Sequence, residues 1–152
     1  MKKHVYSTLL NTNIEEAWGF FTSPMNLAKI TPKEMNFEIK TIDDPETIYP
    51  GMVITYCVSP FPLYRTGWIT EITHIKVNKY FIDDQRVGPY KFWQHQHHFE
   101  EVNEGIMMTD VIHYSIGYGW LGLLIEKYFV KSQVDKIFKY REQQIKKIFG
   151  SR

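Results

Sequence analysis

The stretch WQHQHHF, residues 93–99, carries large side chains at every second position. These side chains are Trp93, His95, His97 and Phe99. Alternate side chains of a β-strand lie on the same face of the sheet, so two imidazoles would stand between two aromatic rings. His98 shares the opposite face with glutamines, and we expect it to lie outside. Imidazole is an acid, a base, a metal ligand or a hydrogen-bond partner near neutral pH, so the first face is the candidate site.

Carboxylates from both neighbouring strands are expected on this face. A hairpin turn at residues 103–104 sets an antiparallel register that places Asp110 opposite His97. A turn at residues 88–89 places Asp83 opposite His95 on the other side. The same two registers pair Met108 with Phe99, Tyr114 with Trp93 and Gln85 with Trp93. One strand earlier, a register that sets Trp68 opposite Gln85 puts Trp68, Thr70 and Ile72 on the same face.

Two His–Asp pairs on one face fit three kinds of site. In a structural polar network, each aspartate only satisfies a histidine, because a buried polar group without a partner costs about 1–3 kcal/mol. In an acid–base site, Asp110 would orient His97, or Asp83 would orient His95, as a general base. The register places no serine or cysteine nucleophile beside either histidine.

The third kind of site is a metal centre. The His-x-His spacing on one strand, with an acid across it, resembles the ligand spacing of strand-borne metal sites. Each histidine has its own aspartate in the predicted register, however, and we expect no metal. A flavin or nicotinamide is not expected either, because no glycine-rich phosphate loop occurs, and so no cofactor is predicted.

The spacing of apolar residues along the chain changes once, from the period of a strand to that of a helix. Alternating, β-branched and aromatic segments predict seven strands, and an Asn13-to-Glu16 capping box and Ser23-Pro24 predict two short helices after the first strand. The predicted strands are residues 4–10, 37–42, 52–58, 66–75, 79–86, 91–101 and 106–114. After Gly117 apolar residues recur at helical spacing, at positions 123, 130, 134, 137, 145 and 148, which predicts one long helix over about 120–149. Arg141 lies on its apolar stripe, either as an edge residue that reaches solvent or as a buried cation with a partner.

Short turns between sequential strands indicate an antiparallel sheet, and a single long amphipathic helix must bury its stripe on one face of that sheet. The predicted class is therefore α+β: a curved seven-stranded antiparallel sheet wrapped around a long C-terminal helix. A sheet curled around one helix leaves room for a ligand between them.

This order resembles the helix-grip fold of the START/Bet v1-like (SRPBCC) superfamily. The run FIDDQRVGPYKFWQHQHHFEEVNEGIMMTDVIHY, which begins at Phe81, is similar to a bacterial ligand-binding SRPBCC family often labelled "cell division inhibitor". The matching motif residues are Phe81, Asp83, Gln85, Gly88, Pro89, Trp93, His95, His97, Phe99, Gly105, Met108, Asp110 and Tyr114. The resemblance implies no single reaction, because the superfamily includes lipid carriers, hormone receptors, cyclases and chaperone regulators.

Composition limits the remaining choices. The 152 residues suit one domain, residues 1–152, and the chain is 43% hydrophobic and 16% aromatic, with a net charge of +1. Such a charge does not indicate a nucleic-acid partner. The single Cys57 fits a reducing compartment, and neither a signal peptide nor an apolar run of membrane-spanning length is apparent, so we expect a cytoplasmic protein. We also expect a monomer or weak dimer.

The favoured hypothesis is a binding protein for a small, mostly apolar molecule with one or two polar groups. The alternatives are a lyase- or cyclase-type enzyme that uses one of the His–Asp pairs, and an interaction module that takes no ligand. The predicted ligand-binding residues are Trp68, Gln85, Trp93, His95, His97, Phe99, Met108, Asp110, Tyr114 and Arg141. If the protein is an enzyme, the predicted catalytic residues are His97, Asp110, His95 and Asp83.

Overall fold

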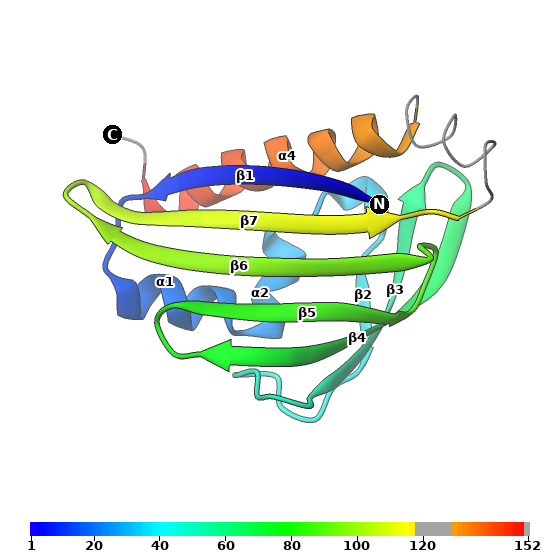
Figure 1. Ribbon diagram of the computed structural model, residues 1–152, viewed down its shortest axis with the longest axis horizontal. Helices are drawn as coiled ribbons and strands as arrows, with labels where there is room; N and C mark the ends of the chain where they lie inside the picture. The colour runs from blue at the N-terminus through cyan, green and yellow to red at the C-terminus, as the bar shows by residue number, and fades with distance from the viewer. Residues whose placement is uncertain (118–128, 151–152) are drawn as a thin grey trace.

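The computed structural model describes residues 1–117 and 129–150. Its seven strands form one antiparallel sheet in the order β1-β7-β6-β5-β4-β3-β2, with one long helix and short helices after the first strand (Figure 1). This confirms the predicted architecture. The strands are β1 (Lys2–Leu10), β2 (Glu38–Thr41), β3 (Val53–Phe61), β4 (Tyr64–Lys76), β5 (Tyr80–Val87), β6 (Phe92–Val102) and β7 (Gly105–Ser115).

The short helices begin where the capping signals predict. Helix α1 (Ile14–Phe21) is capped by Asn13, whose Oδ1 accepts a hydrogen bond of 2.9 Å from the backbone N–H of Glu16. Helix α2 (Pro24–Leu27) has proline at its first position and continues into the 3₁₀ turn η1 (Ala28–Ile30). A further 3₁₀ turn, η2 (Lys33–Met35), was not predicted.

The long C-terminal helix, α4, is described over Lys131–Phe149 and is followed by Gly150 at a φ of 83°. The predicted start near residue 120 lies outside the described residues. Val134, Phe138, Arg141 and Ile145 form its buried stripe. Ile148, which belonged to the predicted stripe, is 44% exposed. In this last turn Phe149 takes the inward position instead and packs on rings of α1.

The strand registers agree with the sequence next to WQHQHHF and differ further away. His97 pairs with Asp110 across β6–β7, and Asp83 pairs with His95 across β5–β6, both as predicted. The paired positions of β5 and β6 follow the predicted register and end at Asp84 with Gln94, one pair before Gln85 and Trp93. In β4–β5, Gln85 pairs with Thr70, two residues from the predicted partner, because the ladder contains bulges. Between the bulges, from Thr70 to Ile72, the shift is two residues, and such a shift keeps these side chains on their predicted face.

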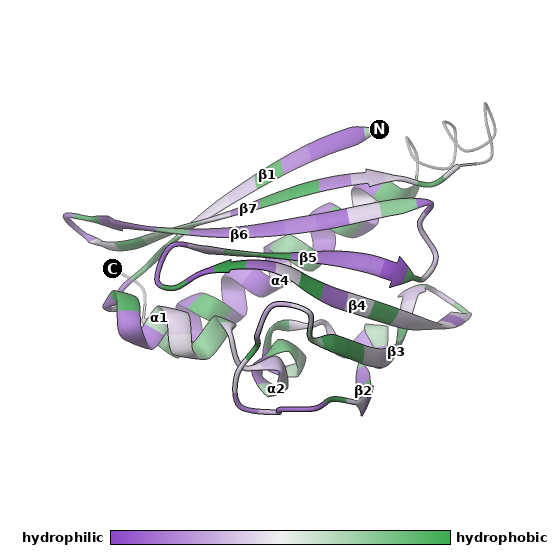
Figure 2. Cartoon of the chain, turned by 60° about the horizontal axis from the view of Figure 1, so that its bottom comes forward, coloured by the Kyte–Doolittle hydropathy of each residue, from purple (hydrophilic) through white to green (hydrophobic). Residues whose placement is uncertain are grey.

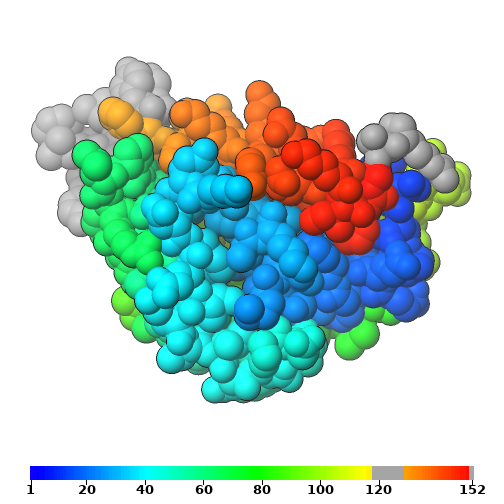
Figure 3. All heavy atoms as spheres, turned by 180° about the vertical axis from the view of Figure 1, so that it is seen from behind, coloured from blue at the N-terminus to red at the C-terminus, as the bar shows by residue number. Residues whose placement is uncertain are grey.

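The sheet is polar as well as apolar along its central strands. Figure 2 shows long hydrophilic stretches on β5 and β6 beside hydrophobic segments of their neighbours. Seen from behind, α4 and the segment that contains α1 and α2 lie across this side of the molecule (Figure 3). Among the described residues, no helix is long and apolar enough to span a membrane.

Candidate ligand site

A cavity of about 180 Å³ lies between the sheet, the short helices and α4. Most of its wall is apolar or aromatic, with contributions from every one of these layers. Representative wall residues are Phe21, Leu27, Ile30, Ile48, Ile54, Trp68, Ile72, Tyr90, Trp93, Val134 and Phe138. Its polar groups are few and come mainly from the sheet and α4. They include Tyr56, Thr70, Asp83, His95, His97 and Arg141. An apolar pocket with a few convergent polar groups is the usual form of a small-molecule site.

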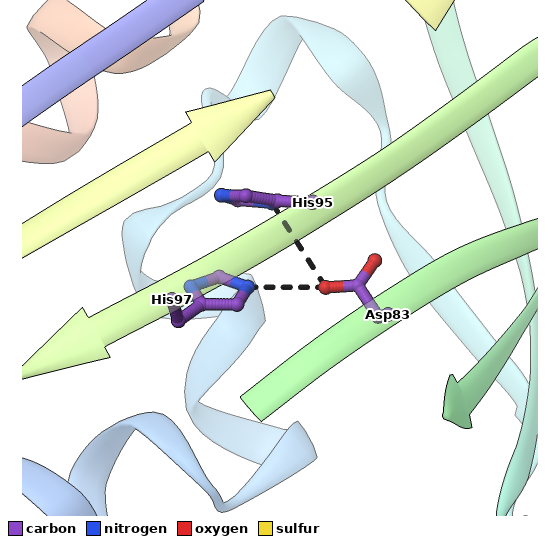
Figure 4. Close-up of side chains that lie close together, drawn as sticks. All are labelled: Asp83, His95 and His97. Carbon is purple, nitrogen blue, oxygen red and sulfur yellow. Dashed lines mark hydrogen bonds and ion pairs between the residues drawn. The ribbon is translucent and has the colours of Figure 1, made fainter. Parts of the chain in front are cut away.

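The polar wall is a row of four side chains across three strands. His95 and His97 of β6 lie between Asp83 of β5 and Asp110 of β7, because residues two apart on a strand share a face. The two imidazole rings lie close together in a tilted arrangement, with centroids 3.8 Å apart and planes inclined by 36°. Figure 4 shows both rings directed toward Asp83.

Each imidazole contacts both carboxylates. His95 Nε2 is hydrogen-bonded to Asp110 Oδ1 at 2.7 Å, and its Nδ1 lies 3.9 Å from Asp83 Oδ2. His97 Nε2 is hydrogen-bonded to Asp83 Oδ2 at 3.0 Å. Its Nδ1 lies 3.0 Å from Asp110 Oδ1 but does not reach hydrogen-bond geometry. The hydrogen bonds are therefore diagonal: each histidine bonds the aspartate that does not stand opposite it in the register.

Burial and charge act against each other in this row. Burial would raise the pKa of Asp110, but its contacts with His95 and His97 hold that pKa far below its usual range. Burial, together with the neighbouring His97, lowers the pKa of His95. Burial opposes a charge on His97 as well, but its contacts with Asp110 and Asp83 outweigh this and raise its pKa. The arrangement therefore favours the ionised carboxylate of Asp110, and it places a proton more readily on His97 than on His95.

Arg141 is the cation of the site. Its side chain is buried, its Nη1 lies 3.9 Å from Asp110 Oδ1, and its guanidinium carbon lies 4.8 Å from the centre of the Phe138 ring. Of the two alternatives for Arg141, the structure shows the buried cation with a partner. Its Nε is buried without a hydrogen-bond partner among the described residues.

The structure brings only part of the predicted ligand set to the cavity. Trp68, Trp93, His95, His97 and Arg141 line it, as does Asp83 of the predicted catalytic set. Asp110 lies behind the histidines. Four further predicted residues, Gln85, Phe99, Met108 and Tyr114, are not among the lining residues. Phe99, Met108 and Tyr114 are packed in the core.

Gln85 has a structural contact instead. Its Nε2 donates to the Tyr90 carbonyl at 2.7 Å, and its Oε1 accepts from the Tyr90 N–H at 3.3 Å. This holds the β5–β6 loop so that the Tyr90 ring enters the cavity wall. His98 lies outside the cavity lining, as predicted, and its Nε2 is hydrogen-bonded to Gln96 Oε1 at 3.0 Å.

Two polar wall residues of the sheet, Tyr56 and Thr70, were absent from the predicted set. Tyr56 and Thr70 share a hydrogen bond of 2.5 Å between their hydroxyl oxygens, and Trp68 Nε1 donates to Thr70 Oγ1 at 3.1 Å. The alternation of Ile54, Tyr56 and Val58 on β3 is the signal that could have found Tyr56, since buried neighbours on both sides put it on the inner face.

No protein-family profile matches the sequence, and no curated protein matches it either. Solved structures match over nearly the whole chain. Protein CV1439 from Chromobacterium violaceum has a TM-score of 0.72 at 10% identity and covers 100% of both chains. The major latex-like protein 151 of Panax ginseng has a TM-score of 0.67 at 14% identity, covering 99% of this chain and 98% of its own. Ara h 8.0201 has a TM-score of 0.59 at 16% identity, covering 95% and 97%.

These matches, at 10–16% identity, show a shared fold. The chain has the helix-grip fold of Bet v1-like proteins.

Proposed function

We propose that this protein binds a small, largely aromatic molecule with one neutral hydrogen-bonding group, in the cytoplasm. The observation that carries the proposal is the cavity of about 180 Å³, whose wall is mostly apolar with one buried polar row. An engineered cavity of about 150 Å³ takes up benzene, so a molecule of one or two rings matches this volume. Trp68, Tyr90 and Trp93 supply flat faces on which such rings pack.

The charge of the polar row favours a neutral group over an anion. Asp83 and Asp110 contribute two carboxylates to the row, and Arg141 is the permanent cation beside Asp110. A carboxylate placed beside them would meet like charge in a water-poor environment, which is unfavourable. A hydroxyl group can donate to a carboxylate and accept from an imidazole or from Arg141 Nε.

One observation favours an acid–base enzyme as the second candidate. The pKa of His95 is lowered and that of His97 is raised, so one ring suits a base and its neighbour an acid near neutral pH. In this candidate Asp110 and Asp83 orient the rings. A bell-shaped pH–rate profile on a substrate would distinguish it from simple binding.

The test combines discovery of the natural ligand with a probe. Native mass spectrometry of protein purified from its own host is expected to show a co-purifying small molecule. Isothermal titration with 2-naphthol is expected to show one site, and 2-naphthoate should bind more weakly because of its charge.

A matched pair of variants locates the probe. Ile54 lines the cavity, whereas Val53 beside it on β3 points outward and is 44% exposed. Ile54→Phe should fill the cavity and weaken 2-naphthol binding at least tenfold, while Val53→Phe should leave binding unchanged. Thermal melts check that both variants are folded. Equal binding by wild type and Ile54→Phe would place the probe elsewhere and contradict the proposal.

A further inference from the structure

Three side chains of the polar row converge on one point of the cavity wall. Asp83, His95 and His97 each offer one ligand atom, and these atoms lie within 4.8 Å of one another. The converging atoms are Asp83 Oδ2, His95 Nδ1 and His97 Nε2, with the carboxylate oxygen 3.9 Å and 3.0 Å from the two nitrogens (Figure 4). Ligands held at about 2.1 Å by a tetrahedral metal ion stand about 3.4 Å apart. Small side-chain shifts would bring all three to that spacing.

The remaining nitrogen of each imidazole is directed to a second carboxylate. His95 Nε2 lies 2.7 Å and His97 Nδ1 lies 3.0 Å from the same oxygen, Asp110 Oδ1. A metal-bound histidine usually gives its other ring N–H to a carboxylate, which fixes the tautomer and makes the ligand more basic. Here one aspartate serves both rings, and it is itself held near Arg141. The diagonal pairing thus leaves one nitrogen of each ring directed to Asp83.

Position within the fold separates the two carboxylates into different roles. Asp83, His95 and His97 line the cavity, whereas Asp110 is absent from its lining and lies behind the rings. A metal ion on the three ligands would therefore have its open coordination position toward the cavity. Two histidines and one carboxylate with an open position form a ligand set that suits Zn²⁺ and other divalent first-row metal ions.

The charge of the row also favours a cation. A metal ion binds imidazole in its neutral form, and the carboxylates of Asp83 and Asp110 would then have the guanidinium of Arg141 beside them as the permanent positive charge. Burial makes an uncompensated negative charge costly, so an added cation is stabilised at this place.

We propose that Asp83, His95 and His97 form a binding site for a divalent first-row transition metal ion, with Asp110 as the positioning residue behind both histidines. This goes beyond the proposed small-molecule binding and does not depend on it.

The experiment uses the full chain after treatment with a chelator, with Co²⁺ and Zn²⁺ as probes. Visible absorption typical of Co²⁺ with nitrogen and oxygen ligands in low coordination should appear on titration and saturate at one Co²⁺ ion per chain. Added Zn²⁺ should displace the Co²⁺ and remove this absorption. Zn²⁺ affinity is then measured by competition with a chromophoric chelator. Asp83→Asn, His95→Gln and His97→Gln should each abolish stoichiometric binding. Circular dichroism and thermal melts check that each variant is folded; Asp83 is partly exposed, which makes Asp83→Asn the most tolerable change.

Two further variants make the result specific. Asp110→Asn should keep the metal but lower the affinity about 10–100-fold and shift the Co²⁺ spectrum, as expected of a group that acts through the histidines. His98→Gln is the matched control, because His98 is the next residue on β6 and lies on the other face. It should bind Co²⁺ and Zn²⁺ as wild type does.

Three results would overturn the metal site: no change of the Co²⁺ spectrum with wild type, ligand variants that bind as wild type does, or equal loss in His98→Gln. None of these three results would contradict the proposed small-molecule binding, which is tested by the titration with 2-naphthol. Conversely, a wild-type protein that does not bind 2-naphthol could still bind the metal ion.

Discussion

At the scale of single residues, the Asp110 carboxylate is the centre of the polar row. It receives a hydrogen bond from His95 and lies within ion-pair distance of His97 and Arg141. All four of these side chains are buried. When one of these side chains is removed, water does not reach its buried partners to replace the lost hydrogen bond. The effects of substitutions in this row should therefore not be additive.

This non-additivity can be measured as a coupling between His95 and Asp110. His95→Phe leaves a buried carboxylate with fewer partners and should lower the free energy of unfolding by on the order of 3–5 kcal/mol. Asp110→Leu leaves the buried His95 Nε2 without its acceptor and should cost about 1–3 kcal/mol, while His97 keeps its hydrogen bond to Asp83. The double variant should lose less than the sum, by roughly 0.5–3 kcal/mol.

Urea unfolding in the presence of EDTA gives all three values. Gln96→Ala is the control, because Gln96 lies on the opposite face of β6 and should change stability by no more than about 0.5 kcal/mol. Strictly additive losses would show that the 2.7 Å contact between His95 and Asp110 does not contribute.

At the scale of elements, the β6–β7 hairpin sets the position of the whole row. Gly105 begins β7 with a φ of 138°, a region that side chains rarely adopt. A Cβ at this position would also collide with the backbone carbonyl oxygen of Leu10 at the end of β1. The hairpin turn and the β1–β7 contact therefore both depend on glycine here.

We expect Gly105→Ala to lower the free energy of unfolding by at least the cost of such a backbone conformation, about 1–3 kcal/mol. Gly67→Ala on β4 is the matched control, because a Cβ there meets nothing within 4 Å, and its effect should stay below about 1 kcal/mol. Denaturant melts of the two variants test this. Equal stability of the two alanine variants would show that the hairpin adjusts without cost.

At the scale of the whole molecule, buried tyrosines join the layers. Tyr6 of β1 donates a hydrogen bond of 2.6 Å to Asp135 of α4, and its ring stacks on Phe138 at 4.2 Å. Burial, and then the contact with Asp135, raise the pKa of Tyr6. Burial likewise raises the pKa values of Tyr56 and Tyr90 in the cavity wall. In all three, the folded protein holds the phenol proton more tightly than the unfolded chain.

Stability should therefore fall at high pH. An unfolded tyrosine ionises near pH 10, so above this pH the unfolded state binds fewer protons than the folded state, and the free energy of unfolding decreases. The contribution is complete below pH 10 and is lost as pH rises toward the folded pKa values. Urea midpoints measured between about pH 9 and 12 should fall for wild type and fall less steeply for Tyr6→Phe. Tyr64→Phe, at a residue that is 47% exposed, is the control and should keep the wild-type slope.

The sequence alone determined the faces of the strands and the order of the elements. Period-two alternation decides which side chains share a face, and a shift of two residues in register does not change that result. This is why His95, His97, Asp83 and Trp68 were assigned to one face although the predicted β4–β5 register was wrong. The β6–β7 register was predictable because a tight turn leaves few ways to pair the strands.

Only the tertiary structure decided the partners and the enclosed space. The cross-strand register determines which Cα atoms are neighbours, but long side chains also reach diagonal positions on the next strand. Here His95 is hydrogen-bonded to Asp110 and His97 to Asp83, and neither aspartate stands opposite its partner in the register. Bulges in the β4–β5 ladder place Thr70 opposite Gln85, and no local sequence pattern predicts the positions of these bulges. The partner of Arg141 depends on how α4 packs on the sheet, and so does the cavity. Both arise from contacts between segments far apart in the chain, for which a single sequence carries no periodic signal.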